Sequence, residues 1–138
     1  TPLFLGGYEP TTTSICALNH EADIAQRLFD AEVSVPRPEG VRDFPCHYFD
    51  IHPVMYEGDI PTFCMEYVPA DKNGSYQFIS LIEKDIQEEV DKARKLGFTP
   101  GIDAESPQNI LYLPYRALYL IDFTLWKAPG QTTLPWKQ

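Results

Sequence analysis

The amino-acid sequence predicts an α+β fold made of two similar modules, each with the order strand, helix and three strands. Three observations predict it. Apolar patterns of the same kind follow one another in the same order in both halves, with a repeat of about 60 residues. An Asp-Ile pair opens the helical pattern of each half, at residues 23–24 and 85–86. A turn signal, Asn73-Gly74, separates the halves.

We expect a single domain over residues 1–138, because this length is near the commonest size of one domain. Module one should occupy about residues 12–70 and module two about residues 75–128. The segments before and after them, which contain Gly and Pro, are expected to form an N-terminal arm and a C-terminal tail. A hydrophobic content of 43% is enough for a core.

Module one is expected to open with a strand at residues 11–19, a run of β-branched and apolar side chains. A helix is predicted over residues 23–32, because Asp23 is a good N-cap and apolar residues then recur at helical spacing. His20 should therefore lie in the loop before this helix, and the prolines from residue 36 onward should end it. Two more strands are predicted at residues 44–53 and 60–69, with a turn at residues 54–59 around Gly58.

Module two is expected to repeat this order, beginning with a strand at residues 76–83. The clearest helix of the sequence follows at residues 85–96. Asp85 is its N-cap, acidic residues crowd its start, Lys and Arg crowd its end, and Gly97 closes it. Three strands are predicted after it, at residues 98–104, 109–115 and 117–127.

The composition argues against several classes of partner. A net charge of −9 disfavours nucleic acid and anionic membranes as binding partners. No apolar run is long enough for a membrane span, and the first residues do not resemble a signal peptide, so we expect a cytoplasmic protein. Three cysteines without C-x-x-C spacing do not predict a disulfide framework or a structural zinc site.

Several segments are similar to parts of a known superfamily. FISLIEKDIQEEVDKARKLGF, at residues 78–98, resembles without gaps the strand and following helix of the vicinal oxygen chelate superfamily, which includes glyoxalases, methylmalonyl-CoA epimerases, extradiol dioxygenases and bleomycin-binding proteins. NILYLPY followed by LYLIDFTLW, at residues 109–126, is similar to its closing strands, and TFCMEYVPA, at residues 62–70, to the equivalent strand of the first module. The resemblance implies curved sheets around a central ligand cleft, as in glyoxalases.

The resemblance also implies a set of site residues. Members of the superfamily usually hold a divalent metal with side chains from the first and last strands of each module. The last-strand positions correspond to Glu66 and Asp122, and the first-strand positions to Phe78 and to either Ser14 or Cys16, depending on register. Phe78 stands where His is typical and cannot bind a metal. We therefore expect no bound metal or other cofactor.

Strand alternation places Glu66 and Asp122 on faces that mix polar and apolar residues, and these faces should line the cleft. We name both as candidate catalytic carboxylates, with His47 as a candidate partner. The alternative is that the two carboxylates face solvent and do nothing. Further candidates for ligand binding are Ser14, Cys16, Cys64, Phe78, Ser80 and Trp126. A cysteine nucleophile would need a base beside it, and none is readable in the sequence.

Three functions fit these patterns. The first is an isomerase or lyase that uses carboxylate acid/base chemistry on a small, largely apolar metabolite. The second is a protein of the same fold that binds and sequesters a small molecule, and the third is an interaction module with a filled cleft. A pocket with converging carboxylates of shifted pKa would favour the enzyme, and a wide, open pocket would favour binding. A homodimer is compatible with each of the three.

Overall fold

The computed structural model describes residues 12–49, 55–69, 79–113 and 117–137. Its elements confirm the α+β class. In chain order they are α1 (Thr12–Asp30), β1 (Pro38–Phe49), β2 (Met55–Met65), α3 (Ile79–Lys95), the short 3-10 helix η1 (Pro107–Asn109), β3 (Ile110–Leu113) and β4 (Ala117–Leu120).

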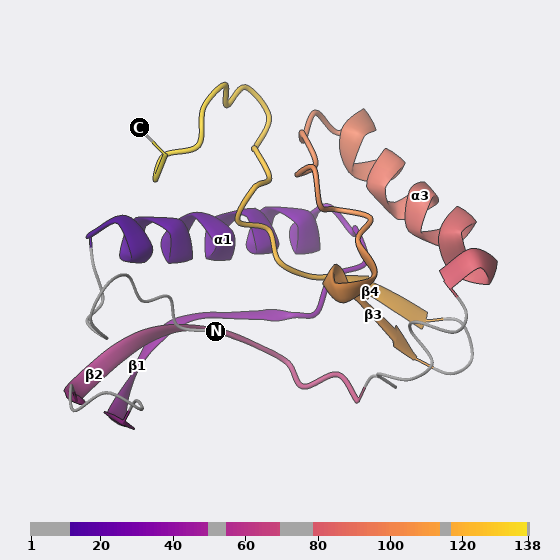
Figure 1. Cartoon of the computed structure of the whole chain (residues 1–138). Coiled ribbons are helices and arrows are strands. Elements are labelled where there is room, and N and C mark those ends of the chain that lie inside the picture. Colours follow the sequence, from indigo (N-terminus) through magenta and orange to yellow (C-terminus); the bar gives the residue numbers. More distant parts are fainter. Residues whose placement is uncertain (1–11, 50–54, 70–78, 114–116, 138) are drawn as a thin grey trace.

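Figure 1 shows α1 crossing the middle of the molecule, with the β1–β2 ribbon beneath one end of it and α3 with the β3–β4 pair near the other end. Each pair of strands is antiparallel and forms a sheet of its own. Val41 faces Phe63 in the first sheet, and Ile110 faces Leu120 in the second. The C-terminal tail passes over α1, as Figure 1 also shows.

The core forms because α1 buries one long apolar stripe. Ala17, Leu18, Ile24, Ala25 and Leu28 recur at spacings of three, four and seven residues and are at most 4% exposed. They pack with residues of α3, of both sheets and of the segment after β4, among which Val90, Leu120, Phe123 and Trp126 are at most 1% exposed. Among the described helices, none is long and apolar enough to cross a membrane.

Both helices end in the same way. At the end of α3 the N–H of Phe98 donates to the carbonyl of Ala93, and Gly97 has φ 100°, so Gly97 closes this helix as predicted. At the end of α1 the N–H of Val33 donates to Leu28 in the same pattern, but the left-handed residue is Glu32, with φ 64°. The helix was predicted to end near this residue, but its left-handed turn was not predicted, because a glycine normally marks such a turn.

The predicted strands that open the two modules are wrong within the described residues. Residues 12–19 form the first turns of α1, and residues 79–83 belong to α3. The apolar stripe of α1 extends back to Ala17 and Leu18, and its burial outweighs the β-branched character of the threonine run. The β-α-β-β-β order is therefore not observed, and each helix is instead followed by an antiparallel pair of strands.

Three shorter assignments also need correction. Residues 55–59 belong to β2, so the predicted turn at 54–59 is wrong. Residues 98–104 do not form a strand: Thr99 makes an isolated bridge to Lys127, and residues 102–104 lie in a turn. The last predicted strand, 117–127, ends at Leu120.

The chain changes direction directly after β4. Asp122 has φ 65°, a left-handed conformation that ends the strand, and the N–H of Ile121 donates to the carbonyl of Asn109. The chain then lies against α1, where Phe123 and Trp126 enter the core with their rings packed edge to face at 5.5 Å. This change of direction brings the polar side chains of Asp122 and Thr124 to the side of α1.

Candidate functional site

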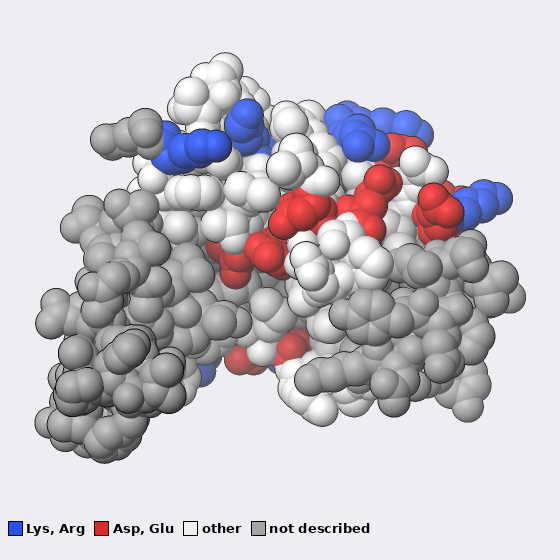
Figure 2. Space-filling model, in the orientation of Figure 1, with Lys and Arg blue, Asp and Glu red and all other residues white. Residues whose placement is uncertain are grey.

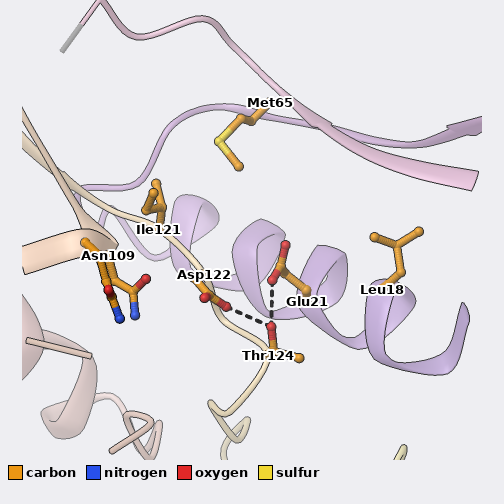
Figure 3. A pocket seen from close by; sticks show the side chains of 8 residues that line it. Leu18, Glu21, Met65, Asn109, Ile121, Asp122 and Thr124 are labelled. Carbon is orange, nitrogen blue, oxygen red and sulfur yellow. Dashed lines mark hydrogen bonds between the residues drawn. The ribbon is translucent and has the colours of Figure 1, made fainter. Parts of the chain in front are cut away.

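A cavity of about 400 Å³ lies between α1, the end of β2 and the segment after β4. Figure 3 shows side chains from these three parts of the chain pointing into it. The residues that line it are Leu18, Glu21, Met65, Gln108, Asn109, Ile121, Asp122 and Thr124. This volume is at the small end of the range for ligand sites, so it suits a small metabolite.

Glu21 projects into this cavity from the buried stripe of α1. It stands three residues after Leu18 and four before Ala25, both of which are buried, so helix geometry forces the carboxylate towards the core side of α1. Its Oε2 lies 2.9 Å from the hydroxyl of Thr124. The backbone N–H of Phe123 also donates to the Glu21 carboxylate. The helix and the segment after β4 are thus joined at this point.

The hydroxyl of Thr124 contacts a second carboxylate as well. Asp122 Oδ1 lies 2.8 Å from the same oxygen. A threonine hydroxyl has one proton to donate, so it cannot donate to two ionised carboxylates at once. Both short contacts are hydrogen bonds if one of the two carboxyl groups is protonated. That group donates to the Thr124 hydroxyl, and the hydroxyl donates to the second, ionised carboxylate. The geometry therefore favours a pair of carboxylates that hold one proton between them (Figure 3).

Burial and neighbouring charge act on the pKa of Glu21. Burial raises the pKa of Glu21 above its ordinary value of 4.5, and the charge of Asp122 raises this pKa further. The hydrogen bonds from Thr124 and from the Phe123 backbone act in the opposite direction without cancelling the rise. Asp122 is exposed to solvent, whereas Glu21 is half-buried. Of the two, Glu21 is the carboxyl group whose surroundings favour the protonated form.

The surroundings of the pair strengthen this assignment. Among the described residues that line the cavity, none is Lys, Arg or His, so no cation of the lining offsets the two acids. Figure 2 shows acidic side chains running across the middle of the drawn face, whereas Lys and Arg collect along its upper edge. Leu18, Met65 and Ile121 give the cavity apolar walls, and the side chains of Gln108 and Asn109 add amide groups.

The backbone at Asp122 adds a further mark of a functional site. Asp122 is one of two residues other than glycine with a positive φ in the described part of the chain. Such conformations often occur at sites where a side chain has to be held in one place. Here the turn points Asp122 back towards Thr124, and the indole N–H of Trp136 donates to the carbonyl of Thr124 and holds this segment from outside.

The structure brings Asp122 into the cavity but does not place Glu66 there. Glu66 follows β2, and its Oε1 accepts a hydrogen bond of 2.7 Å from the backbone N–H of Arg37. Its own N–H donates to the Arg37 carbonyl. Glu66 thus clamps the start of β1 to the end of β2, and Glu21 takes the position opposite Asp122 that we had expected for Glu66.

The other predicted catalytic and binding residues are spread over the chain. His47 lies in β1, paired with Glu57, and its side chain is outside the described part. Ser80 lies in α3 with an undescribed side chain, and Phe78 is outside the described residues. The roles of these three residues stay predictions.

The remaining candidates are described, and none of them lines this cavity. Ser14 and Cys16 lie on α1, not on a strand, and Ser14 is buried. Cys64 lies in β2, where its thiol donates to the carbonyl of Thr62 at 3.6 Å. Trp126 was expected on a face that lines the cleft, but it is 1% exposed and belongs to the core.

The described residues at the metal-ligand positions implied by the superfamily do not fit a metal site. Glu66 is bonded to the backbone of Arg37, Asp122 to Thr124, and the first-strand positions Ser14 and Cys16 are on a helix. No group of three or more His, Cys, Asp or Glu side chains in the described ranges is arranged to hold a metal ion. The chemistry of the cavity is therefore derived from its own side chains.

Glu21 was missed because the helix was predicted to begin at residue 23. Once α1 is extended to Thr12, Glu21 is the one charged residue among the apolar positions 17, 18, 24, 25 and 28 of the same stripe. A carboxylate in the apolar stripe of a helix is a readable signal of a buried polar group.

Comparison of the chain with protein-family models, with curated proteins and with solved structures gives no match. The geometry of the cavity is thus the basis for assigning a function.

Proposed function

We propose that this chain is an acid/base enzyme, an isomerase or lyase, that moves protons on a small, largely apolar metabolite. The observation that supports the proposal is the hydroxyl of Thr124 lying 2.9 Å from Glu21 and 2.8 Å from Asp122 in a cavity with apolar walls. Two carboxylates kept in different protonation states supply an acid and a base side by side. The proposal rests on this arrangement and not on the resemblance to the vicinal oxygen chelate superfamily.

Each residue has a definite role in this proposal. The Asp122 carboxylate removes a proton from a carbon next to a carbonyl group of the substrate. Neutral Glu21 donates its proton to the carbonyl oxygen, which gives an enol. The proton on Asp122 then adds to a different carbon of the conjugated enol, while the enol O–H returns its proton to Glu21, so that both carboxyl groups are restored. The hydroxyl of Thr124 holds the two carboxyl groups beside each other during these steps. Gln108 and Asn109 line the cavity; the Asn109 amide already donates to the Asp103 carbonyl, so Gln108 is the residue assigned to orient the carbonyl.

Sequestration of a ligand without chemistry is the second candidate function. The small volume and the apolar walls suit it equally well. A purely binding pocket, however, gains nothing from two adjacent acids that repel each other, so the shared hydroxyl favours the enzyme.

Hydrogen exchange on model substrates tests the proposal. The protein is incubated in D₂O with a panel of small apolar ketones, and loss of the α-proton signals is followed by NMR. We expect exchange above the buffer rate for at least one ketone, and a fall of about 10²- to 10⁴-fold in Glu21→Gln and in Asp122→Asn. Glu66→Gln is the matched control, because Glu66 bonds to the backbone outside the cavity, and it should exchange at the native rate.

The outcomes separate the candidates. Ketones that bind, as shown by shifted protein resonances, but never exchange faster than in buffer would replace the enzyme with the sequestering protein. Exchange that is equally fast in native protein and Glu21→Gln would remove the proposed acid.

A further inference from the structure

A second hollow, an open groove of about 490 Å³, lies between α1 and the C-terminal tail. Neither the acid/base proposal nor any other part of the cavity chemistry uses it. Its lining comes from one face of α1, with two residues of the tail opposite. The residues are Ile15, Cys16, Asn19, His20, Asp23, Gln131 and Pro135. Two of these, Cys16 and His20, form a nucleophile and a base in neighbouring turns of one helix.

The position of His20 differs from the loop expected for it. His20 lies within α1, is 6% exposed, and its Nε2 is 2.6 Å from the carbonyl oxygen of Trp126. A carbonyl can only accept a hydrogen bond, so Nε2 carries the proton of the neutral ring. Nδ1 is then left with a lone pair, and no described residue donates to it. His20 is thus a base whose tautomer is fixed by the backbone of the core.

Cys16 lies one helical turn before His20. Residues four apart on a helix are neighbours on the same face, about 5–6 Å apart at Cβ. Cys16 is half-buried and lines the groove, so a ligand can reach its thiol. Nucleophile, base and a third group that orients the base are the three parts that activate a cysteine. The sequence analysis placed His20 in a loop, whereas in the structure α1 continues through both residues and His20 lies one helical turn from the thiol, in the lining of the same groove.

The opposite wall of the groove offers donors for a carbonyl oxygen. The Oε1 of Gln131 accepts a hydrogen bond of 2.9 Å from the N–H of Ala128. This contact fixes the orientation of the amide and leaves both N–H groups of Nε2 for a ligand. The carboxylate of Asp23 is held by Arg27 at 3.0 Å. Ile15 and Pro135 supply apolar contacts.

We propose that Cys16 is a nucleophile that reacts with α,β-unsaturated carbonyl compounds bound in this groove, with His20 as its base. The thiol proton moves to Nδ1 of His20, and the sulfur forms a bond to the β-carbon. The π electrons of the C=C bond shift towards the carbonyl oxygen, which Gln131 Nε2 stabilises. The α-carbon then takes the proton back from His20. The product is a thioether, with no leaving group and no oxidant.

The native chain contains its own comparison. Cys64 is also half-buried, but its thiol donates to the carbonyl of Thr62 and no described histidine lies beside it. The full chain is treated with N-phenylacrylamide at pH 7, and the adduct at each cysteine is followed by peptide mass spectrometry. We expect Cys16 to react about 10²-fold faster than Cys64, with a rate that saturates as the probe concentration rises. Equal rates, or a rate at Cys16 that stays linear with concentration, would overturn the proposal.

Two variants assign the roles. His20→Gln can still donate to the Trp126 carbonyl but offers no base, so Cys16 should slow to the rate of Cys64. Gln131→Glu keeps the acceptor for the Ala128 N–H and removes the donors, so saturation should be lost. A native reaction rate at Cys16 in folded His20→Gln would refute the role of His20. If circular dichroism shows that His20→Gln does not fold, the proposal is tested by the other two results. The rate at Cys16 should saturate with probe concentration in the native chain and stay linear in Gln131→Glu, and any other pair of results would overturn the proposal.

Discussion

Replacement of Thr124 by Val tests the arrangement on which the proposed function depends. Val keeps the branched shape of Thr but has no hydroxyl, so the contacts of 2.9 Å to Glu21 and 2.8 Å to Asp122 are both lost. The half-buried Glu21 then keeps only the donor from the backbone of Phe123. The exposed Asp122 is solvated by water instead, so we assign no loss of unfolding free energy to its hydrogen bond with Thr124.

The magnitude follows from the Glu21 bond. A hydrogen bond to a charged group contributes roughly 1.5–3 kcal/mol, and one between neutral groups about 1 kcal/mol. Because the pKa of Glu21 is raised, we take a value within these limits and expect Thr124→Val to lower the unfolding free energy by about 2 kcal/mol. For a chain of this length that corresponds to a fall in Tm of roughly 6–10 °C.

Thr124→Ser is the matched control, because it keeps the hydroxyl and loses only a methyl group. Thermal unfolding of the three proteins at pH 7, followed by circular dichroism, gives the comparison. Thr124→Ser should lie between the native protein and Thr124→Val. A Thr124→Val protein as stable as Thr124→Ser would show that the hydroxyl does not bridge the carboxylates, and the shared proton would have to be abandoned.

The remaining predictions concern the same acid, the helix ends and the strand clamp. Because the folded pKa of Glu21 is raised, its protonated form stabilises the fold below the ordinary value of 4.5, and this contribution is lost as pH rises through the folded pKa. The Tm of Glu21→Gln relative to native protein should therefore increase from pH 4 to pH 7, and a constant difference would contradict the raised pKa. Gly97→Ala should lower the unfolding free energy, measured with urea, by about 1–2 kcal/mol, because φ at Gly97 is 100° and a Cβ would lie 3.2 Å from Pro129. Glu32→Gly should raise the unfolding free energy by about 1 kcal/mol, because Glu32 also has a left-handed φ. A gain for Gly97→Ala together with a loss for Glu32→Gly would refute the assignment of the helix ends. Glu66→Gln should change the unfolding free energy by less than about 0.5 kcal/mol, because Gln still accepts the backbone hydrogen bond; a loss of several kcal/mol would show that the charge itself is needed.

Local patterns were sufficient for part of the fold. The helix over residues 85–96 was predicted because its apolar spacing, its charges and Gly97 all indicate the same element. The strands predicted at 44–53 and 60–69 overlap β1 and β2, since β-branched and aromatic residues are dense there. Asp122 was singled out from the resemblance and from strand alternation, and it does line the cavity, although it follows β4 and does not lie on a strand.

The start of α1 could not be read from local preference. Threonine and isoleucine favour a strand, but Ala17 and Leu18 continue the apolar stripe of Ile24 and Leu28. Burial of that stripe against α3 and the sheets stabilises a helix over these residues. The missed turns of α1 then hid Glu21 from the analysis of the sequence. They hid the pair of Cys16 and His20 for the same reason.

The sequence by itself determined the α+β class, the helix that ends at Gly97 and the presence of acidic residues among apolar ones. Only the tertiary structure decided which acids meet. Glu21 and Thr124 stand 103 positions apart, and their contact depends on the left-handed turn at Asp122 and on the packing of Phe123 and Trp126 against α1. Local propensity acts over a few residues, whereas a site of this kind forms only when burial of the core brings distant segments together.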